Sequence, residues 1–218
     1  SVAGYFIDAA CRRGESALFF AFEESGPQIE RNLNSIGLDL SGALRRGVLQ
    51  VQAARPTTSG LEGHLSTMHR LIDEKRPRVV VVDPISNLIS VGTSSEVKAM
   101  LARLIDFMKM RQVTAMFTSL TIDEGCPEAT DVGISSFMDT WLVLQNLEQN
   151  GERTRSLNVV KSRGMAHSNQ VREFNLSRRG FELVEVVRRG GKVLVGSERA
   201  AFRSDGAPRT GVGSRYPR

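Results

Sequence analysis

The sequence predicts an α/β fold in which a parallel β-sheet carries helices on both faces and is extended by antiparallel strands near its C-terminal end. Three observations predict it. Apolar strand-like runs alternate with amphipathic helix-like segments up to about residue 120. The run Val79–Val82 is continuously β-branched, which is typical of a strand covered on both faces. From about residue 137, hairpin-like segments replace the alternation.

The parallel part follows from the spacing of apolar residues and from the residues that end each segment. Apolar side chains at helical spacing predict a first helix that ends at Gly14, and further helices at 25–37, 60–77 and 95–111. Strands are expected between these helices, at 16–23, 47–54, 78–83 and 113–120.

The antiparallel part is predicted by turn chemistry. The segments "TWLVLQNLEQ" and "RSLNVVKSR" flank Asn150-Gly151, a dipeptide that favours a tight hairpin, and "QVREFNLSRRGFELV" continues the run. We therefore expect one domain over residues 1–197. Residues 198–218 are basic and rich in Gly, Pro and Ser, which predicts a disordered tail.

Composition indicates a soluble globular domain. Of the 218 residues, 40% are hydrophobic and 24% are charged, and no run reaches the roughly 20 apolar residues of a membrane span. The two cysteines form neither a disulfide framework nor a metal-binding motif, so a reducing cytoplasm is the default expectation. Without an initiator Met or a signal-peptide pattern, the chain is expected to begin within a fold.

Charge is unevenly distributed along the chain. Residues 1–150 hold 14 Lys and Arg against 18 Asp and Glu, a net −4, whereas residues 151–218 hold 15 against 6, a net +9. The basic part could contact nucleic acid, an acidic partner or phosphates. Few aromatic residues lie among these cations, which favours a solvated face and a tail over a nucleic-acid site.

Polar side chains stand at the carboxyl ends of three predicted strands, where open parallel sheets bind ligands. These are Glu23-Glu24, Asp83 and Thr118-Ser119. A carboxylate after a buried strand can hold Mg²⁺ or its water shell, although it can equally cap a helix or a turn. One of the paired glutamates could act as a general base, or both could interact with the dipole of the following helix.

Four segments in order resemble the KaiC family, RecA-type ATPases of the circadian clock and their bacterial relatives. They are "FAFEESGPQIERNLNSIGLDL", "RVVVVDPISNL", "ATDVGISSFMDTWLVLQ" and "NVVKSRGMAH". The resemblance covers roughly residues 1–197 and implies a RecA-like P-loop NTPase core that binds ATP and Mg²⁺.

The resemblance also implies roles for individual residues. Glu23 and Glu24 match the paired catalytic glutamates, with Glu23 the favoured base, and Asp83 matches the Walker B aspartate that holds Mg²⁺ through water. Ile36 falls where the family places a residue against the nucleotide base. Residues expected to reach a neighbouring subunit's ATP are Lys161, Ser162 and Arg163, with Arg155 and His167 nearby. Taken alone, Lys161 and Arg163 would be interpreted as strand-surface charges.

Two serines match hydroxyls that the kinase-type members of the family phosphorylate. They are Ser135 and Ser136, with Thr130 just upstream. A phosphate would add about −1.5 to −2 charges there. The alternative is a loop whose serines satisfy backbone groups.

The sequence departs from the family in three respects. It contains no G-x-x-x-x-G-K-[ST] motif, and in the family that loop ends where Ser1 begins, so the chain as given is expected to bind ATP poorly. Met165 and Asn169 replace residues that often contact nucleotide. Pro84 follows Asp83 where a hydroxyl residue is common.

These observations predict part of a KaiC-like ATPase that assembles as a homo-oligomeric ring, a hexamer, with ATP between subunits. It would hydrolyse ATP, could phosphorylate its own serines, and could bind signalling or clock proteins but neither nucleic acid nor a membrane. Two alternatives stay open: a RadA- or RecA-type DNA-dependent ATPase, and a non-catalytic scaffold.

Overall fold

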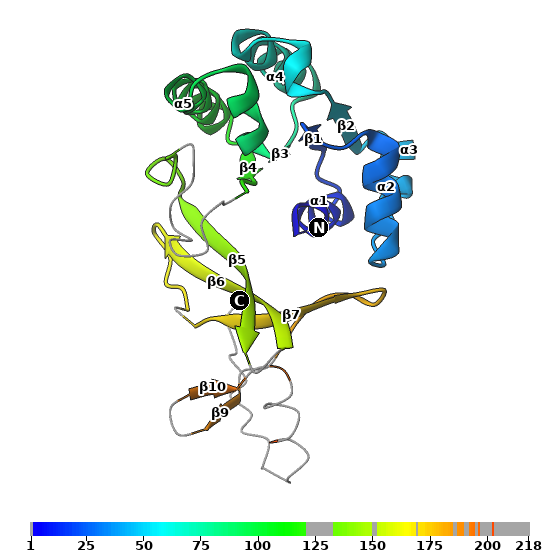
Figure 1. Cartoon of the computed structure of the whole chain (residues 1–218). Coiled ribbons are helices and arrows are strands. Elements are labelled where there is room, and N and C mark those ends of the chain that lie inside the picture. Colours follow the sequence, from blue (N-terminus) through cyan, green and yellow to red (C-terminus); the bar gives the residue numbers. More distant parts are fainter. Residues whose placement is uncertain are drawn as a thin grey trace.

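The computed structural model describes residues 2–120, 133–149, 152–168, 170–184, 187–189 and 192–194, together with residues 196 and 202 (Figure 1). Its helices are α1 Val2–Arg12, α2 Gly26–Ser35, α3 Ser41–Arg45, α4 Leu61–Lys75 and α5 Ser94–Met110, with 3-10 turns η1 Pro56–Thr58 and η2 Ile85–Val91. Its strands are β1 Ala17–Ala21, β2 Leu49–Ala53, β3 Val79–Asp83, β4 Thr114–Phe117, β5 Thr140–Gln149, β6 Glu152–Ser162, β7 Arg172–Ser177, β8 Gly180–Leu183, β9 Val187–Arg189 and β10 Lys192–Leu194.

The first four strands form a parallel sheet in the order β2-β1-β3-β4. β1 is central and pairs along its whole length with β2 and β3, so that Ala21 lies opposite both Ala53 and Asp83. Each of these strands was predicted from its apolar run, and the parallel sheet is confirmed.

Helices cover both faces of this sheet, as predicted (Figure 1). Leu18 and Phe20 of β1 pack into an apolar cluster with α4, η2 and α5. The alternate side chains, Ala17, Phe19 and Ala21, pack into a second cluster with α1, α2 and α3. Successive side chains of a strand point to opposite faces, so a strand that is apolar at every position can fill both clusters.

Two glycines end helices as the sequence predicts. Gly14 after α1 and Gly37 after α2 have φ angles of +77° and +78°, values that glycine adopts without strain. A Cβ atom at Gly37 would lie 2.1 Å from the carbonyl oxygen of Arg178 in the turn between β7 and β8. Gly37 therefore both ends α2 and lets that turn pack against it.

The later strands form a separate antiparallel sheet in the order β5-β6-β7-β8, and β9 pairs with β10 in a small ribbon. The fold class is confirmed, with one difference: among the described residues, no antiparallel strand is hydrogen-bonded to the parallel sheet, which the sequence led us to expect it to extend. Each strand's apolar pattern predicts a strand but does not specify its partner across the fold.

Element boundaries differ from the predicted ones mainly at strand ends. β1 stops at Ala21 and β4 at Phe117, two and three residues earlier than predicted, and α3 was not predicted. The turn at Asn150-Gly151 lies outside the described residues, as does the predicted tail 198–218 apart from Phe202. No helix in the described part of the chain is both long and apolar enough to cross a membrane.

Candidate functional site

The carboxyl ends of β1 and β3 lie side by side at the centre of the parallel sheet. In the sheet, β1 is flanked on one side by β2, the next strand along the chain, and on the other side by β3. The backbone N–H of Phe22 donates to the carbonyl oxygen of Asp83 at 2.9 Å, which keeps the two strand ends paired. Open α/β sheets bind ligands outside the strand ends at such a topological switch point. The fold therefore presents a site here.

Asp83 is the last residue of β3, and its half-buried side chain is held in place by the neighbouring strand. Its Oδ1 accepts a hydrogen bond from the Thr118 hydroxyl, and the backbone N–H of Thr118 donates to Val82 at 3.0 Å. The peptide bond from Asp83 to Pro84 is cis. A carboxylate fixed through one oxygen can present the other to a hydrated cation.

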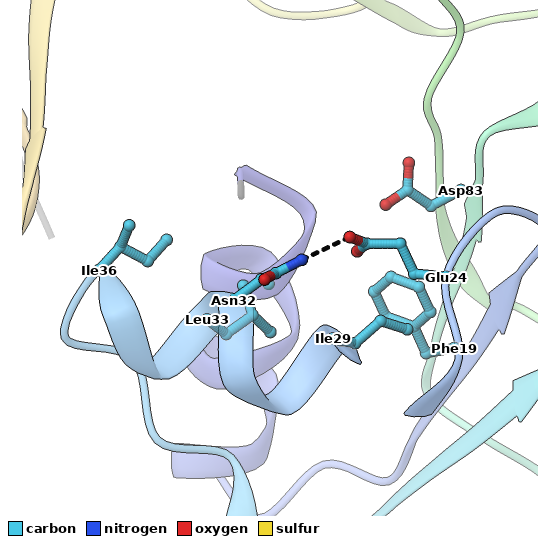
Figure 2. Close-up of a pocket in the computed structure, with 8 residues that line it drawn as sticks. Phe19, Glu24, Ile29, Asn32, Leu33, Ile36 and Asp83 are labelled. Carbon is cyan, nitrogen blue, oxygen red and sulfur yellow. Dashed lines mark hydrogen bonds between the residues drawn. The ribbon is translucent and has the colours of Figure 1, made fainter. Parts of the chain in front are cut away.

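A pocket of about 110 Å³ opens beside this carboxylate, between β1, α1 and α2 (Figure 2). The carboxylates of Glu24 and Asp83 both border it, whereas most of the other lining side chains are apolar. The lining residues are Gly4, Phe19, Glu24, Ile29, Asn32, Leu33, Ile36 and Asp83. The pocket thus combines two acids with an apolar floor.

The two glutamates occupy different positions although they are adjacent in sequence. Both are exposed and lie in the bend between β1 and α2. Glu24 lines the pocket and accepts a hydrogen bond from the Asn32 amide, whereas Glu23 lies outside the set of pocket-lining residues in the described part of the chain. The sequence argument that adjacent acids face different surroundings agrees with this geometry, while the role of each glutamate stays a prediction.

α2 begins immediately after this bend. Pro27 lies in its first turn, and the side chain of Gln28 folds back to accept a hydrogen bond from the backbone N–H of Ser25 at 2.9 Å. The amino end of a helix carries partial positive charge, which favours carboxylates nearby. The glutamate pair can therefore interact with the helix dipole and still serve in catalysis, so the two interpretations are compatible.

A second group of predicted residues lies at the end of β6 on the antiparallel sheet. The Lys161 ammonium donates to the Ser135 carbonyl oxygen at 2.8 Å, and the Arg163 guanidinium donates to the Ser136 carbonyl oxygen at 2.9 Å. Arg163 also lies 4.0 Å from Asp139 and keeps 55% of its side chain exposed. Both serines are exposed. The predicted cations and the predicted phosphorylation sites are thus neighbours.

The remaining predicted residues are spread over the surface. Arg155 is exposed in the middle of β6, His167 is exposed in the segment after β6, and Met165 is 64% exposed. The Ser162 hydroxyl lies 3.2 Å from that of Thr140 on β5. Thr130 and Asn169 lie outside the described residues.

Ile36 lines the pocket at the end of α2. Its carbonyl oxygen accepts a hydrogen bond of 2.8 Å from the Tyr5 hydroxyl of α1. Burial raises the pKa of the Tyr5 phenol above its ordinary value. This bond fixes the end of α2 that closes the pocket.

The structure thus brings Glu24, Ile36 and Asp83 into one pocket, and Lys161, Arg163 and the two serines into a second cluster. Sequence reasoning missed the other residues from α2 that line the pocket. Their signal was available: Ile29, Asn32 and Leu33 recur with Ile36 at helical spacing and form one face, in which Asn32 is the polar member.

Comparison with known proteins identifies the family of this chain. The family model described as "ATPase: KaiC" matches residues 2–188. The chain belongs to the KaiC ATPase family.

Individual KaiC proteins are similar to the chain over most of its length. "Circadian clock protein KaiC2" of Synechocystis sp. is 50% identical over 204 residues, which are 91% of this chain and 35% of that protein. "Circadian clock oscillator protein KaiC" of Picosynechococcus sp. is 34% identical over 194 residues, 88% of this chain and 37% of that protein. The same-named protein of Synechococcus elongatus is 32% identical over 194 residues, with the same coverage. The chain therefore spans about a third of the length of these relatives.

Proposed function

We propose that residues 1–197 form an ATP-hydrolysing domain whose nucleotide lies between neighbouring copies of a homo-oligomeric, hexameric ring. One observation carries the proposal. Glu24 and Asp83 border one pocket at the switch point of the parallel sheet, whereas Lys161 and Arg163 lie near the surface of the other sheet. Acids and cations that a triphosphate needs together thus stand on different surfaces of one copy. Two adjacent copies can supply both.

The pocket fits part of a nucleotide rather than the whole of it. Its volume of about 110 Å³ is below the roughly 300–1,000 Å³ of pockets that enclose small molecules. The described residues hold no glycine-rich loop that could cradle phosphates, so the proposal needs that contact from residues outside them. Ile36 supplies an apolar contact suited to the base.

The acidic residues fit Mg²⁺ better than they fit bare phosphates. Asp83, oriented by Thr118, would hold the ion through a water molecule. When bound, Mg²⁺ supplies positive charge beside the phosphates. The paired carboxylates Glu23 and Glu24 would take the proton from the attacking water as its oxygen bonds to the terminal phosphorus and ADP departs.

The cations would act on the ATP of the adjacent copy. Lys161 and Arg163 would stabilise the charge on the terminal phosphate, as an arginine finger does. Ser162 and Arg155 on β6, and His167 in the segment after it, would add further contacts to that ATP. Hydrogen bonds to backbone carbonyl oxygens orient the Lys161 and Arg163 side chains, and Arg163 also lies 4.0 Å from the Asp139 carboxylate.

The exposed serines support a second step in the same proposal. Ser135 and Ser136 could receive the terminal phosphoryl group, as in the kinase-type members of the family. The similarity to proteins named for the circadian clock favours a role in timing or in related signalling, with partner proteins of that kind.

The test compares ATP hydrolysis by variants of the chain, expressed with its natural upstream segment. Replacing the base by Gln should lower kcat by about 100-fold or more. Glu23→Gln, Glu24→Gln and Asp83→Asn are the informative variants, and Glu30→Gln on α2 is the control. A wild-type protein that neither binds Mg-ATP nor hydrolyses it would overturn the proposal in favour of a scaffold. Hydrolysis that requires single-stranded DNA, with strongly salt-dependent binding, would instead support the RadA- or RecA-type alternative.

A further inference from the structure

The backbone of Phe22 is held on both sides although β1 ends one residue earlier, at Ala21. The Phe22 N–H donates to the Asp83 carbonyl oxygen at 2.9 Å. The Phe22 carbonyl oxygen accepts a hydrogen bond of 3.4 Å from the Nδ2 of Asn87, a residue 65 positions further along the chain. Glu23 follows directly. The two bonds therefore fix the backbone at the point where the chain leaves the sheet and enters the bend with the two acids.

The Phe22 side chain is anchored as well. It is buried in the apolar cluster with α4, η2 and α5. The ring of His64 on α4 contacts it edge-on, with centroids 5.2 Å apart and ring planes at 83°. His64 is also buried, and its Nε2 lies 2.7 Å from the carbonyl oxygen of Pro56 in η1. The core thus holds the ring of Phe22, and Asn87 adds a bond to the carbonyl group that leads into the bend.

Asn87 itself extends from a well-anchored segment. It lies half-buried in η2, where Ile85 and Leu88 are both 0% exposed. The Ile85 N–H donates to the carbonyl oxygen of Thr118 at 2.8 Å, which connects η2 to the residue after β4. Asp83 and Asn87 are four residues apart on this segment. The Asn87 amide therefore links the position of the bend to the position of the Asp83 carboxylate.

We propose that Asn87 is a positioning residue that holds the bend with Glu23 and Glu24 at a fixed place relative to Asp83. This inference rests on the proposed ATP hydrolysis. In that reaction a carboxylate takes a proton from the attacking water while Asp83 holds the hydrated Mg²⁺ on the same nucleotide. Small displacements between such groups lower the rate strongly. Asn87 acts on the acids through the backbone of Phe22 and not by contact with the reacting atoms.

Loss of the amide should affect the rate more than the binding of nucleotide. Asn87→Leu keeps the approximate shape of the side chain and removes the donor, so kcat should fall about five- to tenfold. KM for ATP and the Mg²⁺ requirement should stay nearly unchanged, because Ile36 and Asp83 keep their places in the pocket. Asn87→Gln keeps an amide donor on a longer side chain and should recover part of the rate.

A second readout does not depend on hydrolysis. In Asn87→Leu the N–H of Phe22 should exchange with deuterium faster than in the wild type, because the released carbonyl lets the bend open more often. Mass spectrometry of a peptide that contains Phe22 measures this exchange in the protein with its natural upstream segment. Unchanged exchange would overturn the inference.

Ser90→Ala is the matched control. Ser90 is exposed, and its hydroxyl donates to the Asn87 carbonyl oxygen at 2.7 Å within η2. Its replacement therefore alters the same 3-10 turn without removing the bond to Phe22. This variant should keep both the wild-type exchange and the wild-type kcat.

A triple-mutant comparison separates positioning of the acids from other effects of Asn87. Adding Asn87→Leu to the variant that carries both Glu23→Gln and Glu24→Gln should not lower its residual rate further. An unchanged kcat in Asn87→Leu, an equal loss in Ser90→Ala, or a full extra loss in the triple variant would overturn the inference and leave ATP hydrolysis intact. A wild-type protein without hydrolysis would overturn both.

Discussion

The two sheets of this protein are covered to very different extents. In the parallel sheet, every residue of β1 is buried and Val79–Val82 of β3 are 0–3% exposed. In the antiparallel sheet, β5 buries Val143 but leaves Leu142 and Leu144 38% and 44% exposed. The parallel sheet is closed by helices on both faces, whereas the antiparallel sheet keeps an accessible face.

This difference matches the roles that we propose for the residues of each sheet. Asp83 stands at the end of a buried strand whose register fixes it, as its pairing with Ala21 shows, and the two glutamates follow β1 in the next bend. The cations Lys161 and Arg163 stand on the open sheet, where long flexible side chains can reach outward. A rigid sheet thus suits groups that need fixed geometry, and an exposed sheet suits groups that must meet another molecule.

The largest expected difference between the two sheets is in how much a leucine side chain contributes to the free energy of unfolding. Leu18→Ala in β1 removes a side chain that is 1% exposed, so it should lower the free energy of unfolding by about 2–5 kcal/mol. The same substitution at Leu144 of β5 should cost less than about 0.5 kcal/mol. Urea denaturation of both variants measures the two values. Equal losses of unfolding free energy in the two variants would contradict the difference in burial between the two sheets.

A second prediction concerns the fixed carboxylate at the end of β3. Thr118→Val removes the hydroxyl that donates to Asp83, so the Mg²⁺ concentration that half-activates hydrolysis should rise about tenfold. The matched control is Thr114→Val, at the exposed start of β4, which should keep the wild-type requirement. If both variants need the same Mg²⁺ concentration as wild type, Thr118 does not orient a metal-binding group.

The smallest expected effect concerns pH and the helices over the parallel sheet. The His69 ring of α4 stacks on Phe107 of α5 with centroids 3.9 Å apart. Burial lowers the pKa of His69, and Arg111 lowers it further, although Asp73 opposes this. The unfolded chain therefore binds a proton that the folded chain does not, so the free energy of unfolding should decrease as pH falls below about 6.5.

Replacing the ring separates this contribution from the others. In His69→Phe, the dependence of urea midpoints on pH between about 5 and 7 should become flatter. His167→Ala, at an exposed position beyond β6, serves as the control and should keep the wild-type slope. If the urea midpoint of His69→Phe depends on pH as steeply as that of the wild type, His69 is not the source of this pH dependence.

Local features of the sequence predicted most of the elements and part of the site. Periodic apolar residues predicted the long helices and strands. Gly14 and Gly37 predicted two helix ends, and in the structure both have the positive φ angles that glycine adopts without strain. Because Asp83 and the glutamates follow the carboxyl ends of predicted parallel strands, the sequence indicated that they would be neighbours. These features depend on a few adjacent residues, so one sequence suffices to find them.

Features set by contacts distant in the chain were not predicted. The separation of the two sheets depends on which strand edges meet, and the packing of the β7–β8 turn on Gly37 brings together residues about 140 apart. The choice of Glu24 over Glu23 as the pocket residue depends on the bend after Ala21 and on Asn32. The alternation of side chains along an extended strand predicts that the two glutamates point in different directions, but it does not predict which of them lines a pocket.

The most direct test of the account mixes two inactive variants of the protein. One carries Glu23→Gln and Glu24→Gln, and the other carries Lys161→Ala and Arg163→Ala. In a ring of heterologous contacts, about a quarter of the boundaries in an equal mixture would join intact acids to intact cations. ATP hydrolysis should therefore recover on mixing, to about that fraction of the wild-type rate. Mixed rings, verified with two affinity tags, that stay inactive would contradict a site shared between copies.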